Sequence, residues 1–215
     1  MQEPSGTAIG CMIWLHGLGA DGSDMQGVVQ AMGRYAPPLR HVFLDAPVRP
    51  VTLNGGMPMR AWYDILGMEF SEREDQQGIE ASDRLITTVI DQQIAAGFAA
   101  EQIFLVGFSQ GGAMALWTSL NESRQLGGVV ALSAYLPLIQ QLKWAQPRSV
   151  QFFLGYGNQD PLVLPAWTQL TIQSLQTAGY DEVSVQDYPM EHSICLEEIQ
   201  DITHWLQRQF AGELV

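Results

Sequence analysis

The stretch Gly107-Phe108-Ser109-Gln110-Gly111-Gly112 decides the fold of this 215-residue chain. An apolar run over residues 103–106 precedes it, and the small and apolar residues 113–116 follow it. Strand, Gly-x-Ser-x-Gly turn and helix in this order predict a sharp turn that lifts the serine hydroxyl above the end of a parallel sheet. The turn needs its glycines, because a Cβ at Gly107 or Gly111 would crowd it. It also points backbone N–H groups at the start of the helix toward the same space.

Apolar runs that predict strands alternate with stretches of helical periodicity along the chain. The expected strands cover residues 9–15, 41–44, 103–108, 128–132, 150–154 and 183–188. The expected helices cover residues 24–35, 76–96, 113–120, 166–178 and 194–210, the last with Glu197, Glu198 and Asp201 facing outward. Strands that alternate with helices imply parallel crossovers, and continuously apolar strands are covered on both sides. We therefore predict an α/β protein with a mostly parallel, doubly wound sheet and helices on both faces.

The length of the chain suits one domain over residues 1–215. The connection over residues 46–76 stands out, because it is rich in Pro, Gly, Met and aromatic residues and has no clear period. Connections of this length are usually functional. We expect a lid-like or substrate-shaping loop there.

Composition excludes several classes of function. The net charge is −13 and Lys143 is the only lysine, which argues against nucleic acid and against anionic membrane surfaces. No apolar run is long enough for a membrane helix, so we expect no integral membrane association. The first residues lack the pattern of a secretory signal, and we expect a cytoplasmic protein. Two cysteines, Cys11 and Cys195, indicate neither a disulfide framework nor a metal site.

Polar side chains follow three of the expected strands. Ser109 follows the strand expected at 103–108. Asp160 comes shortly after the strand expected at 150–154, and His192 shortly after the strand expected at 183–188. In an open α/β sheet, ligands bind beyond the carboxyl ends of the strands. The order Ser, Asp, His is also the order in which this class of turn places its partners. We predict that the three side chains meet.

Each of the three residue types has a chemical task in such a group. A serine hydroxyl is a weak nucleophile until a base takes its proton, which an imidazole can do near neutral pH. The carboxylate would fix the tautomer of the ring and stabilise the imidazolium that forms. Other residues of the same types fit less well: His41 begins an expected strand, His204 lies within the last expected helix, Asp187 lies inside the last expected strand and Asp181 precedes it. Ser133 also follows a strand but lacks the glycine-framed turn, and His16 opens a glycine-rich segment.

A glycine-rich segment, His16-Gly17-Leu18-Gly19, follows the first expected strand. A tetrahedral intermediate needs two preorganised N–H donors. We expect the backbone N–H groups of Gln110 and Leu18 to supply them, with His16 holding the backbone of the loop. The segment is not a dinucleotide motif, because no Gly-x-Gly-x-x-Gly spacing opens a helix here.

The chain resembles the small carboxylesterases and acyl-protein thioesterases of the α/β-hydrolase superfamily. The matching segments extend over most of the chain: residues 16–19, 45–47, 59–64, 107–112, 131–133, 136–138, 160–163, 192 and 196–199. Two positions depart from the family pattern. Glu191 stands where the family usually has glycine before its catalytic histidine, and Leu164 stands where it has proline.

The resemblance implies the α/β-hydrolase fold and hydrolysis of short- to medium-chain acyl esters through a covalent acyl-enzyme, with small-molecule esters or thioesters as substrates. Acyl-protein thioesterase and lysophospholipase are the alternatives. It implies no cofactor and no metal, and it allows a homodimer. By position, Ser109, Asp160 and His192 match the triad, and Leu18 and Gln110 match the oxyanion donors. A non-catalytic binding protein of this fold is the rival from another class.

Apolar loop residues near the strand ends are the candidate walls of a substrate pocket. We expect these residues to be Met57, Met59, Trp62, Tyr63, Leu136, Leu162 and Leu164. Flexible methionine side chains would suit varied acyl groups. Each residue could instead belong to the ordinary core, and for Trp62 and Tyr63 we favour that role.

Overall fold

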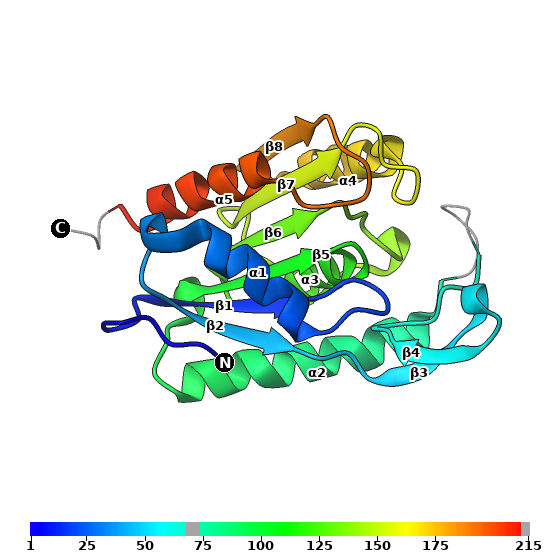
Figure 1. The fold of residues 1–215 in the computed structure, drawn as a ribbon, viewed down its shortest axis with the longest axis horizontal. Helices are drawn as coiled ribbons and strands as arrows, with labels where there is room; N and C mark the ends of the chain where they lie inside the picture. The colour runs from blue at the N-terminus through cyan, green and yellow to red at the C-terminus, as the bar shows by residue number, and fades with distance from the viewer. Residues whose placement is uncertain (68–73, 212–215) are drawn as a thin grey trace.

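The computed structural model describes residues 1–67 and 74–211. Within them, six strands form one sheet in the order β2-β1-β5-β6-β7-β8 (Figure 1). All neighbouring strands of this sheet are parallel. The strands are β1 (Gly10–Leu15), β2 (Leu39–Leu44), β5 (Ile103–Phe108), β6 (Gly128–Leu132), β7 (Gln151–Gly157) and β8 (Val183–Tyr188). The six predicted strands are thus present, and the main difference is that β7 continues three residues further, to Gly157.

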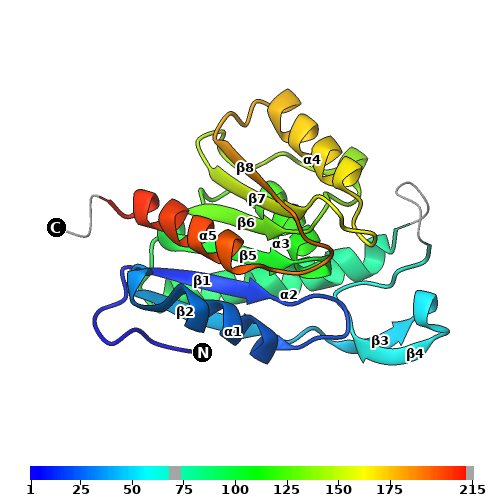
Figure 2. The ribbon, with the colours of Figure 1, turned by 45° about the horizontal axis from the view of Figure 1, so that its top comes forward.

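Helices cover both faces of this sheet, as Figure 2 shows. One face carries α1 (Gly22–Met32) and α5 (Leu196–Gln209); the other carries α2 (Gln76–Ala95), α3 (Gln110–Asn121) and α4 (Pro165–Thr177). Side chains alternate along a strand, so Met12 and Trp14 of β1 pack toward α1 while Cys11 and Ile13 pack toward α2 and α3. This two-sided core confirms the predicted α/β architecture.

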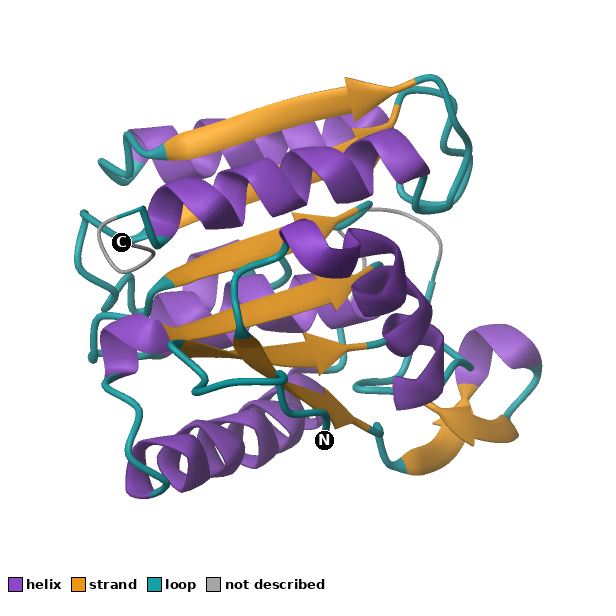
Figure 3. Cartoon of the chain, turned by 60° about the vertical axis from the view of Figure 1, so that its left-hand side comes forward, coloured by secondary structure: helices purple, strands orange, loops and turns teal. Residues whose placement is uncertain are grey.

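A two-stranded antiparallel hairpin stands beside the main sheet (Figure 3). It consists of β3 (Val48–Val51) and β4 (Met57–Arg60), which lie inside the connection that we expected to be a lid-like or substrate-shaping loop. Residues 68–73 of that connection are outside the described part of the chain. After the hairpin, the backbone of Trp62 and Tyr63 hydrogen-bonds to the side chain of Gln110 at the start of α3.

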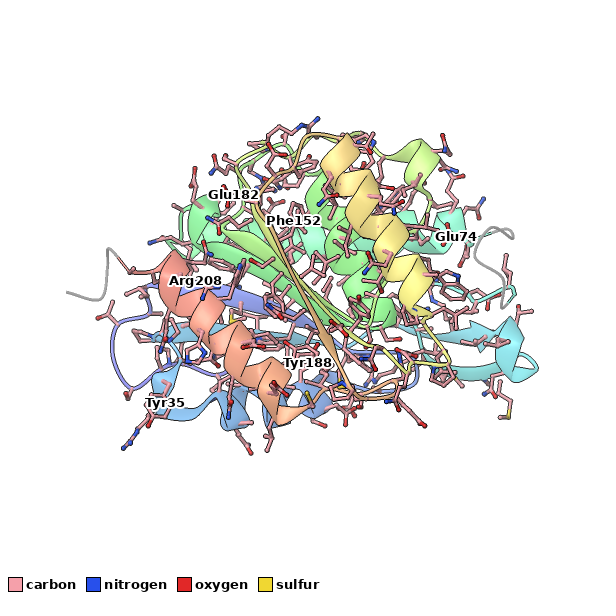
Figure 4. The ribbon with its side chains drawn as sticks, turned by 90° about the horizontal axis from the view of Figure 1, so that it is seen from above. Tyr35, Glu74, Phe152, Glu182, Tyr188 and Arg208 are labelled. Carbon is pink, nitrogen blue, oxygen red and sulfur yellow. The ribbon has the colours of Figure 1, made fainter. Side chains whose placement is uncertain are left out.

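The last helix corrects one sequence expectation. Ile199, Ile202 and Leu206 pack inward as predicted, but Glu198 is fully buried rather than facing outward. Figure 4 labels Glu182 and Tyr188 near the two ends of β8, and Arg208 near the end of α5, so the helix returns the chain over the sheet.

Among the described helices, none is long and apolar enough to cross a membrane.

Candidate active site

Ser109 occupies the sharp turn between β5 and α3. Its backbone has φ 54° and ψ −121°, a conformation that L-residues rarely adopt. The flanking glycines are required by close packing: a Cβ on Gly107 would collide with the backbone of Gly111, and a Cβ on Gly111 would collide with the carbonyl of Leu15. The sequence Gly-x-Ser-x-Gly therefore forms the strained turn that we predicted.

His192 and Asp160 meet beyond the ends of β8 and β7. Nδ1 of His192 lies 2.7 Å from Oδ2 of Asp160. The carboxylate can only accept, so Nδ1–H donates and the lone pair of the ring is on Nε2. The other carboxylate oxygen accepts from the N–H groups of Leu162 at 2.8 Å and Val163 at 3.0 Å. With its side chain fully buried, Asp160 is thus held in place by three hydrogen bonds.

The histidine loop is further fixed by packing. The ring of Phe108 lies 4.8 Å from the ring of His192, centroid to centroid. Gly157, the last residue of β7, lies against the loop, and a Cβ there would collide with the carbonyl oxygens of Met190 and Glu191. The Glu191 side chain, in place of the glycine usual in the family, is exposed.

The glycine-rich loop after β1 is held by His16, as we expected. Nδ1 of His16 donates to the carbonyl of Gly17 at 2.7 Å, and Nε2 accepts from the N–H of Ala46 at 3.0 Å. Both ring nitrogens are therefore engaged with backbone, and the buried ring joins the loop to the start of the 46–76 connection. Leu18, in the middle of this loop, lines the same cavity as Ser109.

The side chain of Gln110 joins the serine turn to the segment after β4. Its Oε1 accepts from the N–H of Trp62 at 2.8 Å, and its Nε2 donates to the carbonyl of Tyr63 at 2.8 Å. Trp62 in turn donates from Nε1 to the carbonyl of His16 at 2.9 Å. Hydrogen bonds thus join the serine turn, the loop after β1 and the segment after β4, which are distant in the sequence. As the first residue of α3, Gln110 has a backbone N–H with no acceptor within the helix.

Ser109 and His192 open into one cavity of about 860 Å³. One side, here called the α1 wall, comes from α1 and the region around the start of α5: Met25, Val28, Ala31, Ile194, Leu196 and Ile199. The other side, here called the aromatic wall, includes Leu53, Tyr63, Ile65, Leu66, Tyr135 and Trp167. Both walls are mostly apolar, and the volume is within the range of about 300–1,000 Å³ typical of ligand sites.

The predicted pocket residues divide into two groups. Tyr63 and Leu162 line the cavity, whereas the other five lie outside its described lining: Met57, Met59, Trp62, Leu136 and Leu164. Trp62 and Leu136 are buried in the core, while Met57 and Leu164 are exposed to solvent. The sequence analysis did not predict the α1 wall. The apolar residues of α1 recur with helical periodicity, and this pattern is the same whether the residues pack on the sheet or line a cavity.

Known proteins with similar sequences and structures share this architecture. The chain matches the family described as Phospholipase/Carboxylesterase over residues 1–210. Acyl-protein thioesterase 1 of Cryptococcus neoformans var. neoformans serotype D is 34% identical, covering 91% of this chain and 90% of that protein. The crystal structure of Zea mays acyl-protein thioesterase 2 superimposes with a TM-score of 0.86 at 26% identity, covering 97% of this chain and 96% of that one. That of Arabidopsis thaliana SOBER1 gives 0.85 at 29% identity, covering 94% and 99%. The chain therefore belongs to the phospholipase/carboxylesterase family of hydrolases.

Proposed function

We propose that the protein is a serine hydrolase that cleaves acyl thioesters and carboxylic esters through a covalent acyl-enzyme. The observation that carries the proposal is the 2.7 Å hydrogen bond between His192 and Asp160 beside the cavity that also contains Ser109. With Nδ1–H bonded to the carboxylate, Nε2 is the basic nitrogen, as a general base requires.

In the proposed reaction, Nε2 of His192 accepts the proton of Ser109 as Oγ attacks the carbonyl carbon of the acyl group. The carbon–sulfur or carbon–oxygen bond then breaks, and the leaving group takes the proton from His192. Water repeats the sequence on the acyl-serine, which releases the carboxylic acid and restores Ser109. Asp160 keeps the ring oriented and stabilises the imidazolium in both halves of the reaction.

The oxyanion that forms in both steps is bound by the backbone N–H groups of Gln110 and Leu18. Gln110 begins α3, where N–H groups have no partner within the helix. In the loop, the neighbouring N–H groups of Gly19 and Ala20 already donate to Arg60 and Gly17 carbonyls. Donors that are fixed before the substrate binds need no reorganisation when negative charge develops.

Thioesters are the favoured substrates. Relatives named acyl-protein thioesterase cover about nine-tenths of this chain, and both walls of the cavity offer apolar surface for an acyl chain. Simple carboxylic esters are the second candidate, supported by the description of the family. The sequence alone favoured the opposite order.

Labelling with a fluorophosphonate probe tests the nucleophile. We expect mass spectrometry to place the adduct on Ser109, and Ser109→Ala to lose both labelling and turnover while Ser174→Ala, at a half-buried serine of α4 outside the described cavity lining, keeps them. Thioester and oxygen-ester pairs with the same acyl group, over graded chain lengths, then rank the substrate classes. A folded wild-type protein that takes no label and turns over neither class would instead be a binding protein.

A further inference from the structure

Glu74 lies beside three aromatic residues of the aromatic wall. Glu74 immediately precedes Asp75, the N-cap of α2, and lines the cavity together with Tyr63, Tyr135 and Trp167. The rings of Tyr135 and Trp167 make an edge contact with centroids 5.9 Å apart. We refer to these four residues as the Glu74 cluster. Figure 4 places Glu74 at the end of the molecule opposite Arg208.

Hydrogen bonds join the carboxyl group of Glu74 to Tyr135 and to the backbone, and join Tyr135 to Tyr63. The hydroxyl groups of Tyr63 and Tyr135 lie 3.3 Å apart, and Tyr135 is hydrogen-bonded to Glu74. The N–H of Leu138 donates to Oε2 of Glu74 at 2.6 Å. Burial raises the pKa of Glu74, and the hydrogen bonds from Leu138 and Tyr135 oppose that rise by stabilising the anion. The cluster therefore holds an oriented carboxyl group beside three aromatic rings.

The charges around the cavity have one sign. Its described lining includes the carboxyl groups of Asp24, Asp64 and Glu74 and, within that described lining, no lysine or arginine. The whole chain has a net charge of −13. A cavity of this kind raises the local concentration of cations and disfavours anionic substrates.

Aromatic rings grouped with a carboxylate are the chemistry that recognises a quaternary ammonium group. The faces of tyrosine and tryptophan attract a cation that is too weakly hydrated to prefer water, and the carboxylate supplies the counter-charge. We propose that the Glu74 cluster is a subsite for a cationic group, so that the enzyme prefers esters and thioesters bearing a quaternary ammonium over neutral or anionic ones. This inference about the substrate rests on the proposed function, whereas the subsite itself does not.

Equilibrium binding tests the subsite without any turnover. Titration calorimetry on Ser109→Ala would compare choline with 3,3-dimethylbutan-1-ol, in which carbon replaces the charged nitrogen at the same shape. We expect choline to bind roughly tenfold more tightly. Equal binding, or weaker binding of choline, would overturn the proposal.

Variants then place the cation. Glu74→Gln keeps the size of the side chain and should reduce the preference for choline roughly tenfold. Asp24→Asn removes the same charge from α1, on the other wall of the cavity, and serves as the matched control. An equal loss in both variants would mean a general field of the cavity and no local subsite. Should Glu74→Gln fail to fold, Trp167→Leu, from α4, provides the second test, and an unchanged choline preference in it would also contradict the cluster.

Kinetics separate this proposal from the proposed function. With wild-type enzyme, kcat/KM for butyrylcholine should exceed that for 3,3-dimethylbutyl butyrate, and in Glu74→Gln the ratio of the two values should fall toward one. A wild-type protein that binds choline but turns over no ester or thioester would refute the proposed hydrolase function and leave the subsite standing. Equal turnover of the two esters would refute the cationic preference alone.

Discussion

The carboxyl group of Glu198 on α5 occupies the space that a side chain at Gly155 of β7 would fill, since a Cβ on Gly155 would collide with Oε1. Glu198 is fully buried, and among the described residues neither of its carboxyl oxygens has a hydrogen-bond partner. Burial raises the pKa of Glu198 to about 8, with the nearby Asp201 adding to the rise. The helix therefore packs on the sheet with a protonated carboxyl group at neutral pH.

Replacement of Glu198 by glutamine should remove a pH dependence of stability. In the folded protein the pKa of Glu198 is above its ordinary value of 4.5, so the folded state binds the proton more tightly than the unfolded state does. The free energy of unfolding is therefore highest below about pH 4.5 and decreases as the pH rises toward about 8. Relative to the wild type, Glu198→Gln should gain on the order of a few kcal/mol in unfolding free energy between these limits. Urea unfolding at several pH values measures this gain. The exposed neighbour Glu197→Gln is the control, and parallel curves for Glu198→Gln and wild type would contradict the prediction.

A second pH dependence, of opposite sign, comes from His41. Nε1 of Trp14 donates to Nδ1 of this buried histidine at 3.0 Å, and burial lowers the pKa of His41 to about 4. A depressed folded-state pKa means that stability is present above about pH 6.5 and is lost as the pH falls toward about 4. On acidification across this range the wild type should lose about 3 kcal/mol of unfolding free energy through His41. We expect His41→Gln, which retains a hydrogen-bond acceptor, to remove this loss. Thermal unfolding across that range should show no such effect for His204→Gln, on the surface of α5.

Removal of the Gln110 side chain should destabilise the protein while its backbone N–H stays in place. Gln110→Ala leaves the buried N–H of Trp62 and the carbonyl of Tyr63 without their partners. Unsatisfied buried groups of this kind cost about 1–3 kcal/mol each. Denaturant unfolding measures the loss, and a variant as stable as wild type would show that water replaces the side chain.

An alanine at Gly157 should impair catalysis through the histidine loop. Its Cβ collides with the backbone carbonyls of Met190 and Glu191, which cannot move aside without displacing His192. We expect kcat for a nitrophenyl ester to fall by about tenfold or more, because small misplacements of a catalytic group have large effects. Gly6→Ala, where no atom lies within 4 Å of the new Cβ, is the matched control. Equal kcat in the two variants would contradict the prediction.

Apolar runs made the four central strands of the main sheet predictable, because parallel strands covered on both faces are buried and apolar over most of their length. The hairpin escaped prediction for an equally local reason. Pro50 and Pro58 stand opposite each other in β3 and β4, and proline, having no N–H to donate, usually argues against a strand. Such short strands are tolerated here because the pair stands outside the main sheet.

The residues of the site differed in how far sequence could place them. Ser109 follows β5 directly, and Asp160 and His192 come shortly after β7 and β8, so the topology of the sheet brought them to its carboxyl edge. The α1 wall depends on how α1 and α5 pack against each other, which periodicity does not encode. Glu198 shows the same limit, since a carboxylate on a helix predicts an outward position and only the glycine beneath it in β7 makes room for burial.

The bonds that Gln110 makes to Trp62 and Tyr63 constrain how this enzyme could change its substrates. A loop transplanted from a relative over residues 46–76 would have to arrive with a backbone that meets the same glutamine, or the serine turn would lose its support. A change in the connection that alters the range of substrates would therefore also act on the turn that carries Ser109.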